Sequence, residues 1–595
     1  MSQIPQRIAA LRSAMQQHGI AATLIPSSDP HLSEYLPGYW QGRRWLSGFH
    51  GSVGLLIVTA DFAGLWADSR YWVQAEQELA GSGITLMKIQ TAASTQHLDW
   101  LAANLASGDS LAVDGDVLGL AAARALQTAL DSAGIALRTD LDLLQSVWTE
   151  RPTLPAAAVY QHLPPHASVG RMEKLAALRA AMQQAGAGWH FISTLDDIAW
   201  LTNLRGSDVN YNPVFIAHLL LGMDDATLFV GAGKVDAELA AVLARDGIAI
   251  AGYRDTKQAL QQLPAASRLL LDPRRITLGL RQAIPDSVQV CEQINPSTML
   301  KSRKTATEAA HVRQAMEQDG AALAEFFAWF EANVGRSRIT ELTIDEQITA
   351  ARARRPGFVC PSFATIAGFN ANGALPHYRA TEHSHSEIAG DGLLLIDSGG
   401  QYLSGTTDIT RVVAVGTPSA EQKRDFTLVL KGMMALSMAH FPAGTLSPML
   451  DALARAPIWQ ADIDFGHGVG HGVGYFLNVH EGPQSISRSL PDASMAMQAG
   501  MITSNEPGIY RPGKWGVRIE NLLLNVAAAD NEFASFLKFE TLTLCPIDTR
   551  CIDRSLLQAN EIDWLNRYHA EVRARLAPLV SGDALAWLQQ ATAAI

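Results

Sequence analysis

The chain has 595 residues, of which 48% are hydrophobic and 17% charged, and its formal net charge is −12. This length predicts two to four domains of about 100–200 residues each, and the composition excludes a disordered chain. An acidic chain without a clustered basic stripe also argues against nucleic acid as a partner.

The N-terminal segment MSQIPQRIAALRSAMQQHG is amphipathic and contains no apolar signal core. No later segment is apolar over the length needed to cross a bilayer. The four cysteines are too few and too scattered for a disulfide framework, and none forms a CxxC pair. These features predict a cytoplasmic protein with no membrane partner.

A near-repeat predicts two similar domains in the first half of the chain. The segments LRSAMQQHG and LRAAMQQAG begin at Leu11 and Leu178, and each precedes a strand-like run, ATLIPSS in one copy and WHFISTL in the other. Both segments have apolar residues at helical spacing and end at Gly, a common helix stop. Chance similarity between two Ala/Gln-rich helices is the alternative, but the recurring strand pattern favours a duplicated α/β domain.

Proline and polar residues interrupt the periodic pattern near 149–155 and 294–305, which predicts domain boundaries there. The predicted division is 1–152, 153–302, 303–535 and 536–595. The third part opens with a predicted long helix with a broad apolar face, capped by Thr305 or Thr307. The apolar stripe of NEIDWLNRYHAEVRARLAPL predicts a helix docked on the body near the end of the chain.

Two aspartates stand at the ends of apolar runs in DGLLLIDSGGQYLSGTTDITRVVAV. Asp397 closes the run LLLI and Asp408 enters the run ITRVVAV, and we expect a Gly-containing turn between two strands. Burying an unpaired carboxylate costs on the order of several kcal/mol, so such acids need a cation, hydrogen bonds or a raised pKa. Either Asp alone equally fits a turn residue hydrogen-bonded to backbone.

Three histidines lie in the Gly-rich segment DFGHGVGHGVGYFLNVHEGP: His467, His471 and His480. The spacing of the first two matches that of zinc ligands on a helix, but the intervening glycines disfavour a helix. We therefore expect a strand or loop whose glycines let the backbone approach a ligand or another segment closely. Taken alone, the segment also fits a Gly-rich turn with surface histidines.

Two glutamates complete the set of candidate ligands in MITSNEPGIYRPGKWGVRIENLLLNV. Glu506 follows a strand-like run and Glu520 lies inside VRIENLLL, although a lone Glu in a strand usually faces water. With Asp397, Asp408 and His471 they make an oxygen-rich set with one imidazole, which suits Mn²⁺, Co²⁺ or Mg²⁺ more than structural zinc. Four carboxylates balance the charge of two divalent cations.

These motifs resemble those of the Xaa-Pro aminopeptidases, a group of the M24 pita-bread metallopeptidases, in their three-domain cytosolic form. The resemblance covers nearly the whole chain, including the blocks DSRYWVQAE and GHGVGHGVG, the acidic motifs and the tail FETLTLCPIDTRCID. It implies a fold of the α/β and α+β classes. Two creatinase-like N-terminal α/β domains would precede a pita-bread catalytic domain with a C-terminal extension.

The resemblance also implies a dinuclear metal site. In the family pattern Asp397 binds one metal, Asp408 and Glu520 bridge both, and His471 and Glu506 bind the second. The implied cofactor is two divalent ions, first Mn²⁺, with Co²⁺ or Zn²⁺ as alternatives. Outer histidines that orient substrate and an arginine that supports the carboxylates complete the implied catalytic set: His377, His467, His480 and Arg518.

The implied reaction is hydrolysis of an N-terminal Xaa-Pro bond by a hydroxide that bridges the two cations, with Glu506 as proton acceptor. The substrates would be peptides with proline at the second position, and the chain would form a homodimer. A prolidase, which cleaves Xaa-Pro dipeptides only, is the enzyme alternative. A non-catalytic pita-bread binding protein is another, but its signature would be lost ligands, and the set is intact here.

Overall fold

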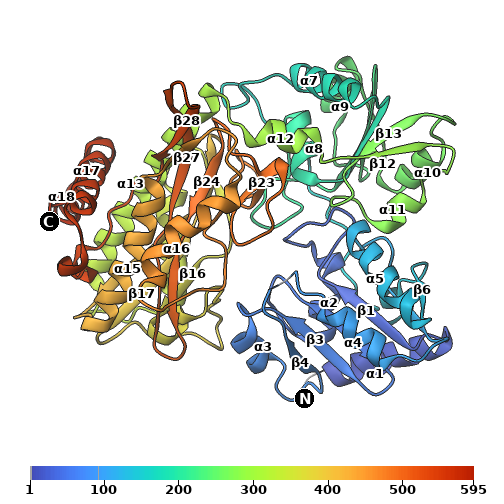
Figure 1. Cartoon of the computed structure of the whole chain (residues 1–595), viewed down its shortest axis with the longest axis horizontal. Coiled ribbons are helices and arrows are strands. Elements are labelled where there is room, and N and C mark those ends of the chain that lie inside the picture. The colour runs from blue at the N-terminus through green and yellow to red at the C-terminus, as the bar shows by residue number, and fades with distance from the viewer. Residues whose placement is uncertain (1–2, 92) are drawn as a thin grey trace. The chain divides into compact units, whose positions relative to one another are not determined.

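A computed structural model describes residues 3–91 and 93–595 of the chain (Figure 1). The chain divides into two compact units, of which unit 2 comprises Pro164–Ser168 and Thr298–Ile595 and unit 1 comprises the residues before Pro164 together with Val169–Ser297. Residues 1, 2 and 92 of the predicted first domain lie outside the described residues. The finer division into four domains stays a prediction.

The first part of unit 1 is built on a six-stranded sheet with the order β4-β3-β2-β1-β5-β6. Its strands, in that order, are Thr85–Lys88, Ala63–Ala67, Leu55–Thr59, Ala22–Pro26, Ser110–Ala112 and Ala136–Arg138. Its helices α1 to α6 are Ile4–Gln17, Gly42–Ser47, Trp72–Glu78, Gln96–Asn104, Leu120–Ala133 and Leu143–Val147.

The second part of unit 1 has a sheet with the order β12-β11-β10-β8-β13-β14. Its strands, in that order, are Ile248–Gly252, Ala226–Val230, Ala217–Gly222, Trp189–Ile192, Arg268–Leu271 and Gln289–Glu292. Its helices α7 to α11 are Arg171–Gln184, Leu195–Thr202, Ala237–Arg245, Thr256–Gln261 and Leu278–Gln282. A short pair, β7 (Tyr160–Gln161) and β9 (Leu204–Arg205), lies outside this sheet.

The two sheets of unit 1 have the same topology. Strand β1 follows helix α1, and β8 follows helix α7; these are the two helices of the sequence repeat. Each of the two strands pairs antiparallel on one side and parallel on the other. The predicted duplication of an α/β domain is therefore confirmed.

Unit 2 combines long helices with a six-stranded sheet of order β21-β28-β27-β24-β22-β23. These strands, in that order, are His440–Pro442, Ser535–Thr541, Asn521–Asp530, Ile502–Asn505, Gly470–Gly472 and Glu481–Ile486. The smaller sheets are β16-β17-β20 (Ile366–Phe369, Gly392–Ser398, Ile409–Val415), β15-β18-β19 (Phe358–Pro361, Gly400–Tyr402, Gly405–Thr406) and β25-β26 (Gly508–Arg511, Trp515–Arg518). The helices α12 to α18 are Pro296–Ser302, Ala306–Asn333, Glu341–Ala353, Ala420–Ser437, Asp451–Trp459, Ala559–Leu576 and Gly582–Ala591.

Helix α13 confirms the predicted long helix at the start of the third part. Thr305 caps it, because its hydroxyl accepts from the backbone of Glu308, whose side chain accepts from Thr305 in return. The apolar face is buried and packs into the interior of unit 2, where α13, α15 and α16 lie alongside the strands (Figure 1).

Two local features differ from the expectation. The connection between β17 and β20 is longer than a single turn, since residues 399–408 include the small strands β18 and β19, and β18 also pairs with β15. The predicted C-terminal helix is confirmed as α17, and a second helix, α18, follows it. Among the described helices, none has the length and apolarity of a membrane span.

Candidate metal centre

The two aspartates enter the site from neighbouring antiparallel strands. Asp397 lies in β17 and Asp408 directly precedes β20, and the register places Asp397 opposite Thr410. Residues two apart on one strand point to the same face, so Asp408 and Thr410 share the face to which Asp397 points. Asp397 is 8% exposed and Asp408 4%, as expected for the buried acids of this segment.

His471 comes from strand β22, which confirms the expectation of a strand rather than a helix for the Gly-rich segment. A Cβ at Gly470 would overlap the carbonyl oxygen of Ser504 in β24, so glycine is needed for the close approach of the two segments. The backbone N–H of Glu506 then donates to the carbonyl of Val469 (2.7 Å). This packing brings Glu506 alongside His471.

Glu520 lies in the break between β26 and β27, not within a continuous strand as the apolar run VRIENLLL indicates. Its backbone N–H donates to the carbonyl of Thr410 (3.1 Å), and its Oε2 accepts from the Thr410 hydroxyl (2.8 Å). Thr410 therefore ties Glu520 to the strand that follows Asp408.

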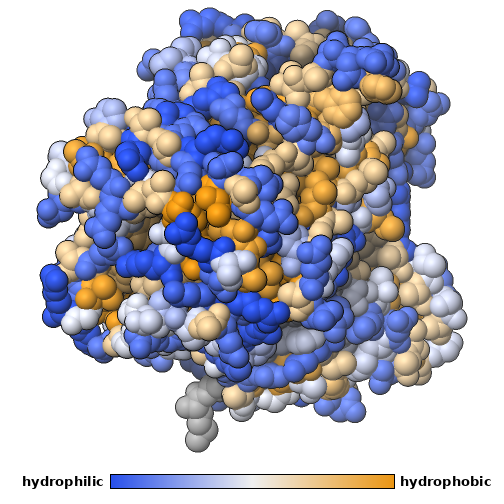
Figure 2. Space-filling model, turned by 60° about the vertical axis from the view of Figure 1, so that its left-hand side comes forward, coloured by the Kyte–Doolittle hydropathy of each residue, from blue (hydrophilic) through white to orange (hydrophobic). Residues whose placement is uncertain are grey.

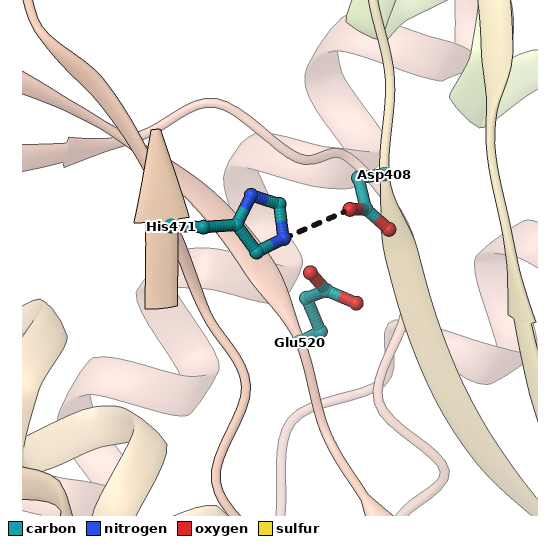
Figure 3. A group of neighbouring side chains, drawn as sticks. All are labelled: Asp408, His471 and Glu520. Atoms are coloured by element: carbon teal, nitrogen blue, oxygen red, sulfur yellow. Dashed lines mark ion pairs between the residues drawn. The ribbon is translucent and has the colours of Figure 1, made fainter. Parts of the chain in front are cut away.

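The candidate ligands converge on one space. His471 Nε2 lies 3.5 Å from Asp408 Oδ2 and 3.5 Å from Glu506 Oε1. One ligand atom each of Asp408, His471 and Glu520 lies within 4.8 Å of the others. Figure 3 shows the imidazole of His471 pointing toward Asp408, with the carboxylate of Glu520 facing the same space.

The donor set fits divalent cations. His471 Nδ1 lies 3.0 Å from the carbonyl of Gly472 and so carries the hydrogen, which leaves the Nε2 lone pair facing the two carboxylates. Asp397 Oδ1 and Glu520 Oε1 are buried and accept no hydrogen bond. Buried oxygen atoms without a hydrogen-bond donor need a cation or a proton beside them.

Burial raises the pKa of several of these carboxyl groups. Removal from water, only partly offset by Arg518, raises the pKa of Asp397 to about 6. The same cause, opposed by His471, raises the pKa of Glu506 to about 7. Burial and then the neighbouring carboxylates raise the pKa of Glu520 well above its ordinary value. Without cations, protons therefore compete for the site up to near-neutral pH.

Arg518 and His467 lie on the outer side of the carboxylates, joined by a residue that the sequence did not identify. Arg518 Nη2 donates to Asp397 Oδ2 (2.6 Å) and its Nη1 donates to the Tyr510 hydroxyl (2.8 Å), which lies 2.7 Å from His467 Nε2. Burial raises the pKa of Tyr510 to about 12, so the hydroxyl keeps its proton. Tyr510 lies four residues after Glu506 in EPGIY, and this short distance from a candidate ligand is the feature of the sequence that could have identified it.

His480 lies on the imidazole side of the site, with its ring centroid 4.3 Å from that of His471 in an edge-on arrangement. The next residue, Glu481, is buried, and its carboxylate lies 2.6 Å from Lys304 Nζ and 3.3 Å from Lys301 Nζ. Since both lysines are also buried, this group of three charges holds the backbone beside His480 in place.

His377 follows the short helical turn Asn370–Ala374 and is half-buried. A Cβ at Gly516 would overlap the carbonyl oxygen of Gly373, so this turn packs directly on β26, the strand that carries Arg518. The next residue, Tyr378, donates its hydroxyl to Glu341 (2.8 Å). These contacts, on either side of His377, fix the position of its backbone.

Models of known families match most of the chain. Residues 310–526 match the metallopeptidase family M24, and residues 535–595 match the C-terminal region of peptidase_M24. Two N-terminal stretches, 7–140 and 150–308, each match a creatinase/prolidase N-terminal domain. The two N-terminal matches agree with the duplicated topology of unit 1.

Individual relatives match over nearly the full length. Aminopeptidase P2 of Arabidopsis thaliana is 37% identical over 97% of this chain and 87% of its own. A probable Xaa-Pro aminopeptidase P of Laccaria bicolor is 38% identical over 98% and 92%. The crystal structure of X-prolyl aminopeptidase from Caenorhabditis elegans, described as a cytosolic enzyme with a di-nuclear active site, superimposes with a TM-score of 0.94 and 32% identity, covering 99% of both chains.

Matches of this extent, together with the convergent acids and imidazole, define the class: the chain belongs to the metallopeptidase family M24. It has the two creatinase-like N-terminal domains and the pita-bread catalytic fold of that family. Within the family it is an enzyme of the Xaa-Pro aminopeptidase type.

The raised pKa values predict how pH changes the effect of the metal. In the metal-free folded state Asp397 and Glu506 hold protons up to pH values of about 6 and 7, whereas in the unfolded state they release them near pH 4. Their contribution to stability is therefore lost as the pH rises through this window. Cations replace the protons, so we expect Mn²⁺ to raise the thermal unfolding midpoint, relative to chelator, more at about pH 8 than at about pH 5.5. A larger increase at the lower pH would contradict this.

The close approach at Gly470 predicts that Gly470→Ala lowers the free energy of unfolding by about 1–3 kcal/mol, because β22 and β24 must separate. Since β24 leads directly into Glu506, the variant should also bind Mn²⁺ more weakly. Gly188→Ala is the matched control, because a Cβ there meets no atom within 4 Å. Denaturant unfolding and a Mn²⁺ titration measure the two effects, and wild-type values for Gly470→Ala would disprove the steric argument.

Proposed function

We propose that this enzyme hydrolyses the N-terminal Xaa-Pro bond of peptides with proline at the second position, using two divalent cations. The observation that carries the proposal is the convergence of His471 Nε2 with Asp408 and Glu506, at 3.5 Å from each, beside the buried Glu520. The relatives named as Xaa-Pro aminopeptidases, and the di-nuclear site of the Caenorhabditis elegans enzyme, support it.

The five side chains would divide between two ions as in the family pattern that the sequence resembles. Asp397 would hold one cation, His471 and Glu506 the other, and Asp408 and Glu520 both, and the proximity of Asp408, His471, Glu506 and Glu520 supports this division. We assign Mn²⁺ to the site because oxygen ligands with one imidazole suit it, with Co²⁺ or Zn²⁺ as alternatives. When bound, two divalent cations would activate a water molecule as the nucleophile near neutral pH and polarise the scissile carbonyl.

The chain's own residues then position the substrate and move its protons. Glu506 would accept a proton at its carboxylate and deliver it to the departing proline nitrogen. The proton is needed because a deprotonated amine is a very poor leaving group. His480, edge-on to His471, would donate a hydrogen bond to the substrate carbonyl as negative charge develops, and His377 would help to orient the substrate, as the family resemblance implies.

The hydrogen-bonded series His467, Tyr510 and Arg518 keeps Asp397 ionised and oriented. Arg518 donates to Asp397 Oδ2 and also lies 4.0 Å from Glu506 Oε2, so one guanidinium serves both carboxylates. His467 Nδ1 lies 2.8 Å from the Gly468 carbonyl, which leaves its Nε2 to accept from Tyr510. The role of these residues is to hold the carboxylates in position for the cations.

For the ligands, we expect Asp408→Ala to abolish turnover and to lower the metal content, because Asp408 contacts His471 and would bridge both ions. Asp563→Ala, an exposed residue of α17, should leave both unchanged. Elemental analysis of purified protein and hydrolysis of an Xaa-Pro peptide measure the two effects. Full activity of Asp408→Ala would refute the site.

Peptide length distinguishes the proposal from the prolidase alternative. The Xaa-Pro dipeptidase from Bacillus anthracis matches 64% of this chain with a TM-score of 0.51 and 23% identity, a similarity that concerns the fold alone. We expect kcat/KM to be higher for Arg-Pro-Pro than for the dipeptide Arg-Pro, and no hydrolysis of Arg-Ala-Ala. Preference for the dipeptide would favour a prolidase, and inactivity on all three with Mn²⁺ present would favour a binding protein.

We further propose that the enzyme is a cytoplasmic homodimer. The description of the Caenorhabditis elegans relative as cytosolic supports the location. For the dimer we assign the outer face of α16 together with the helical turn Ser447–Leu450 before it, where Met449, Leu453 and Trp459 are 66%, 40% and 41% exposed. The two charged residues of this helix, Asp451 and Arg455, are buried and paired, so the exposed side chains of the helix itself carry no charge.

An uncharged apolar face can pair with its own copy across a two-fold axis without repulsion between like charges. Trp459 Nε1 donates to Asp464, which also pairs with Arg488, so the exposed Leu490 belongs to the same region. Hydrophilic residues dominate the face of the molecule drawn in Figure 2, with hydrophobic residues gathered in smaller patches.

We expect Leu453→Arg to convert a dimer to a monomer in sedimentation velocity, because it places a charge on both sides of the axis. Phe533→Arg is the matched control, since Phe533 is 83% exposed on another part of unit 2 and should leave the dimer intact. A dimer that survives Leu453→Arg would exclude the α16 face.

A further inference from the structure

The buried Arg411 connects the proposed metal ligands to the C-terminal extension, residues 536–595. Arg411 follows Thr410 in β20 and is 3% exposed. Because successive side chains in a strand alternate, it points away from the face of Asp408 and Thr410. On that other side its guanidinium donates to the carbonyls of Pro546 (3.1 Å) and Cys545 (2.8 Å), both in the extension.

The same guanidinium also holds the segment of Glu520. Nη1 donates to the backbone carbonyl of Glu520 (2.6 Å) and to that of Thr410 (2.9 Å), and Nη2 donates to Asn521 Oδ1 (2.8 Å). Glu520 sits in a break between strands, where no ladder hydrogen bonds run continuously through it. Arg411 therefore supplies the backbone restraint that a strand would otherwise give.

Helix α17 fixes Arg411 from the side of the extension. The Tyr568 hydroxyl accepts from Arg411 Nη2 (2.9 Å) and lies 2.8 Å and 3.0 Å from the carbonyls of Cys545 and Thr543. The neighbouring His569 accepts from the backbone N–H of Ile547 (3.1 Å), which holds the same segment. Both side chains are buried, so these bonds are shielded from water.

We propose that the C-terminal extension is a working part of the metal centre, in which Tyr568 and Arg411 act as positioning residues for Glu520. The proposal rests on the assignment of Glu520 as a metal ligand under the proposed function. Replacing a residue that orients a metal ligand typically lowers metal affinity about 10- to 100-fold. The extension would thus set how tightly the cations are held rather than take part in the chemistry.

Tyr568→Phe is the sharpest test, because it removes only the hydroxyl and keeps the ring stacked on Trp564. We expect metal-free Tyr568→Phe to fold, and to bind the weaker of its two Mn²⁺ ions about tenfold less tightly than wild type in a calorimetric titration. At saturating Mn²⁺, kcat should stay within about twofold of wild type, since excess cation restores occupancy of the site.

Arg575→Gln is the matched control on the same helix. Arg575 also joins α17 to the body of unit 2, through Glu317 (2.7 Å), but it does not contact Arg411. Its loss weakens docking of the helix and should leave Mn²⁺ affinity unchanged. Arg411→Lys, which keeps the charge but cannot reach the same set of acceptors, should lose at least as much affinity as Tyr568→Phe.

The outcomes separate this inference from the proposed function. The role of the extension would be overturned, with the metal site left intact, if Tyr568→Phe had wild-type Mn²⁺ affinity. It would also be overturned if Arg575→Gln lost as much Mn²⁺ affinity as Tyr568→Phe. A wild-type protein that binds no divalent cation would instead overturn the proposed function, and this inference with it. Weaker Mn²⁺ binding in Tyr568→Phe and in Arg411→Lys, with wild-type binding in Arg575→Gln, would establish that the extension positions Glu520.

Discussion

Negative charge gathered in the interior of unit 2 is the constraint on which the rest of this structure depends. Asp397, Asp408 and Glu520 are buried beside the half-buried Glu506, and Arg518 is the cation that the chain brings into direct contact with Asp397. Desolvation raises the pKa of Asp397, Glu506 and Glu520, so protons compete with metal ions for the site. At neutral pH, bound divalent cations would neutralise the buried carboxylates and would also activate water for peptide hydrolysis.

Close backbone packing allows the acids and the imidazole to meet. The approach of β22 to β24 depends on Gly470, and the approach of the turn before His377 to β26 depends on Gly516. Glu520 occupies a break between strands, where the hydroxyl of Thr410 and the guanidinium of Arg411 replace the continuous ladder. Residues of β20 thus hold the ligand Glu520 in place, and the C-terminal helices in turn hold β20.

The two units of the chain differ in what they contribute to the proposed metal site. All five proposed ligands lie in unit 2, whereas unit 1 consists of two copies of one α/β topology. The full-length similarity to Xaa-Pro aminopeptidases includes both copies and the C-terminal region, while the solved dipeptidase from Bacillus anthracis spans only 64% of the chain.

The sequence alone determined the duplicated N-terminal domains, the long capped helix α13, the rejection of a helix for GHGVGHGVG, and the five residues expected to bind metal. Each of these follows from local periodicity, from capping residues, from glycine spacing or from a motif that resembles a family pattern. Only the tertiary structure showed that Thr410 and Tyr510 complete the site, that Glu520 lies in a break, and that Arg411 reaches Tyr568, 157 positions away. Those contacts depend on how separate sheets pack and on their register, and such long-range geometry leaves no periodic trace in the chain.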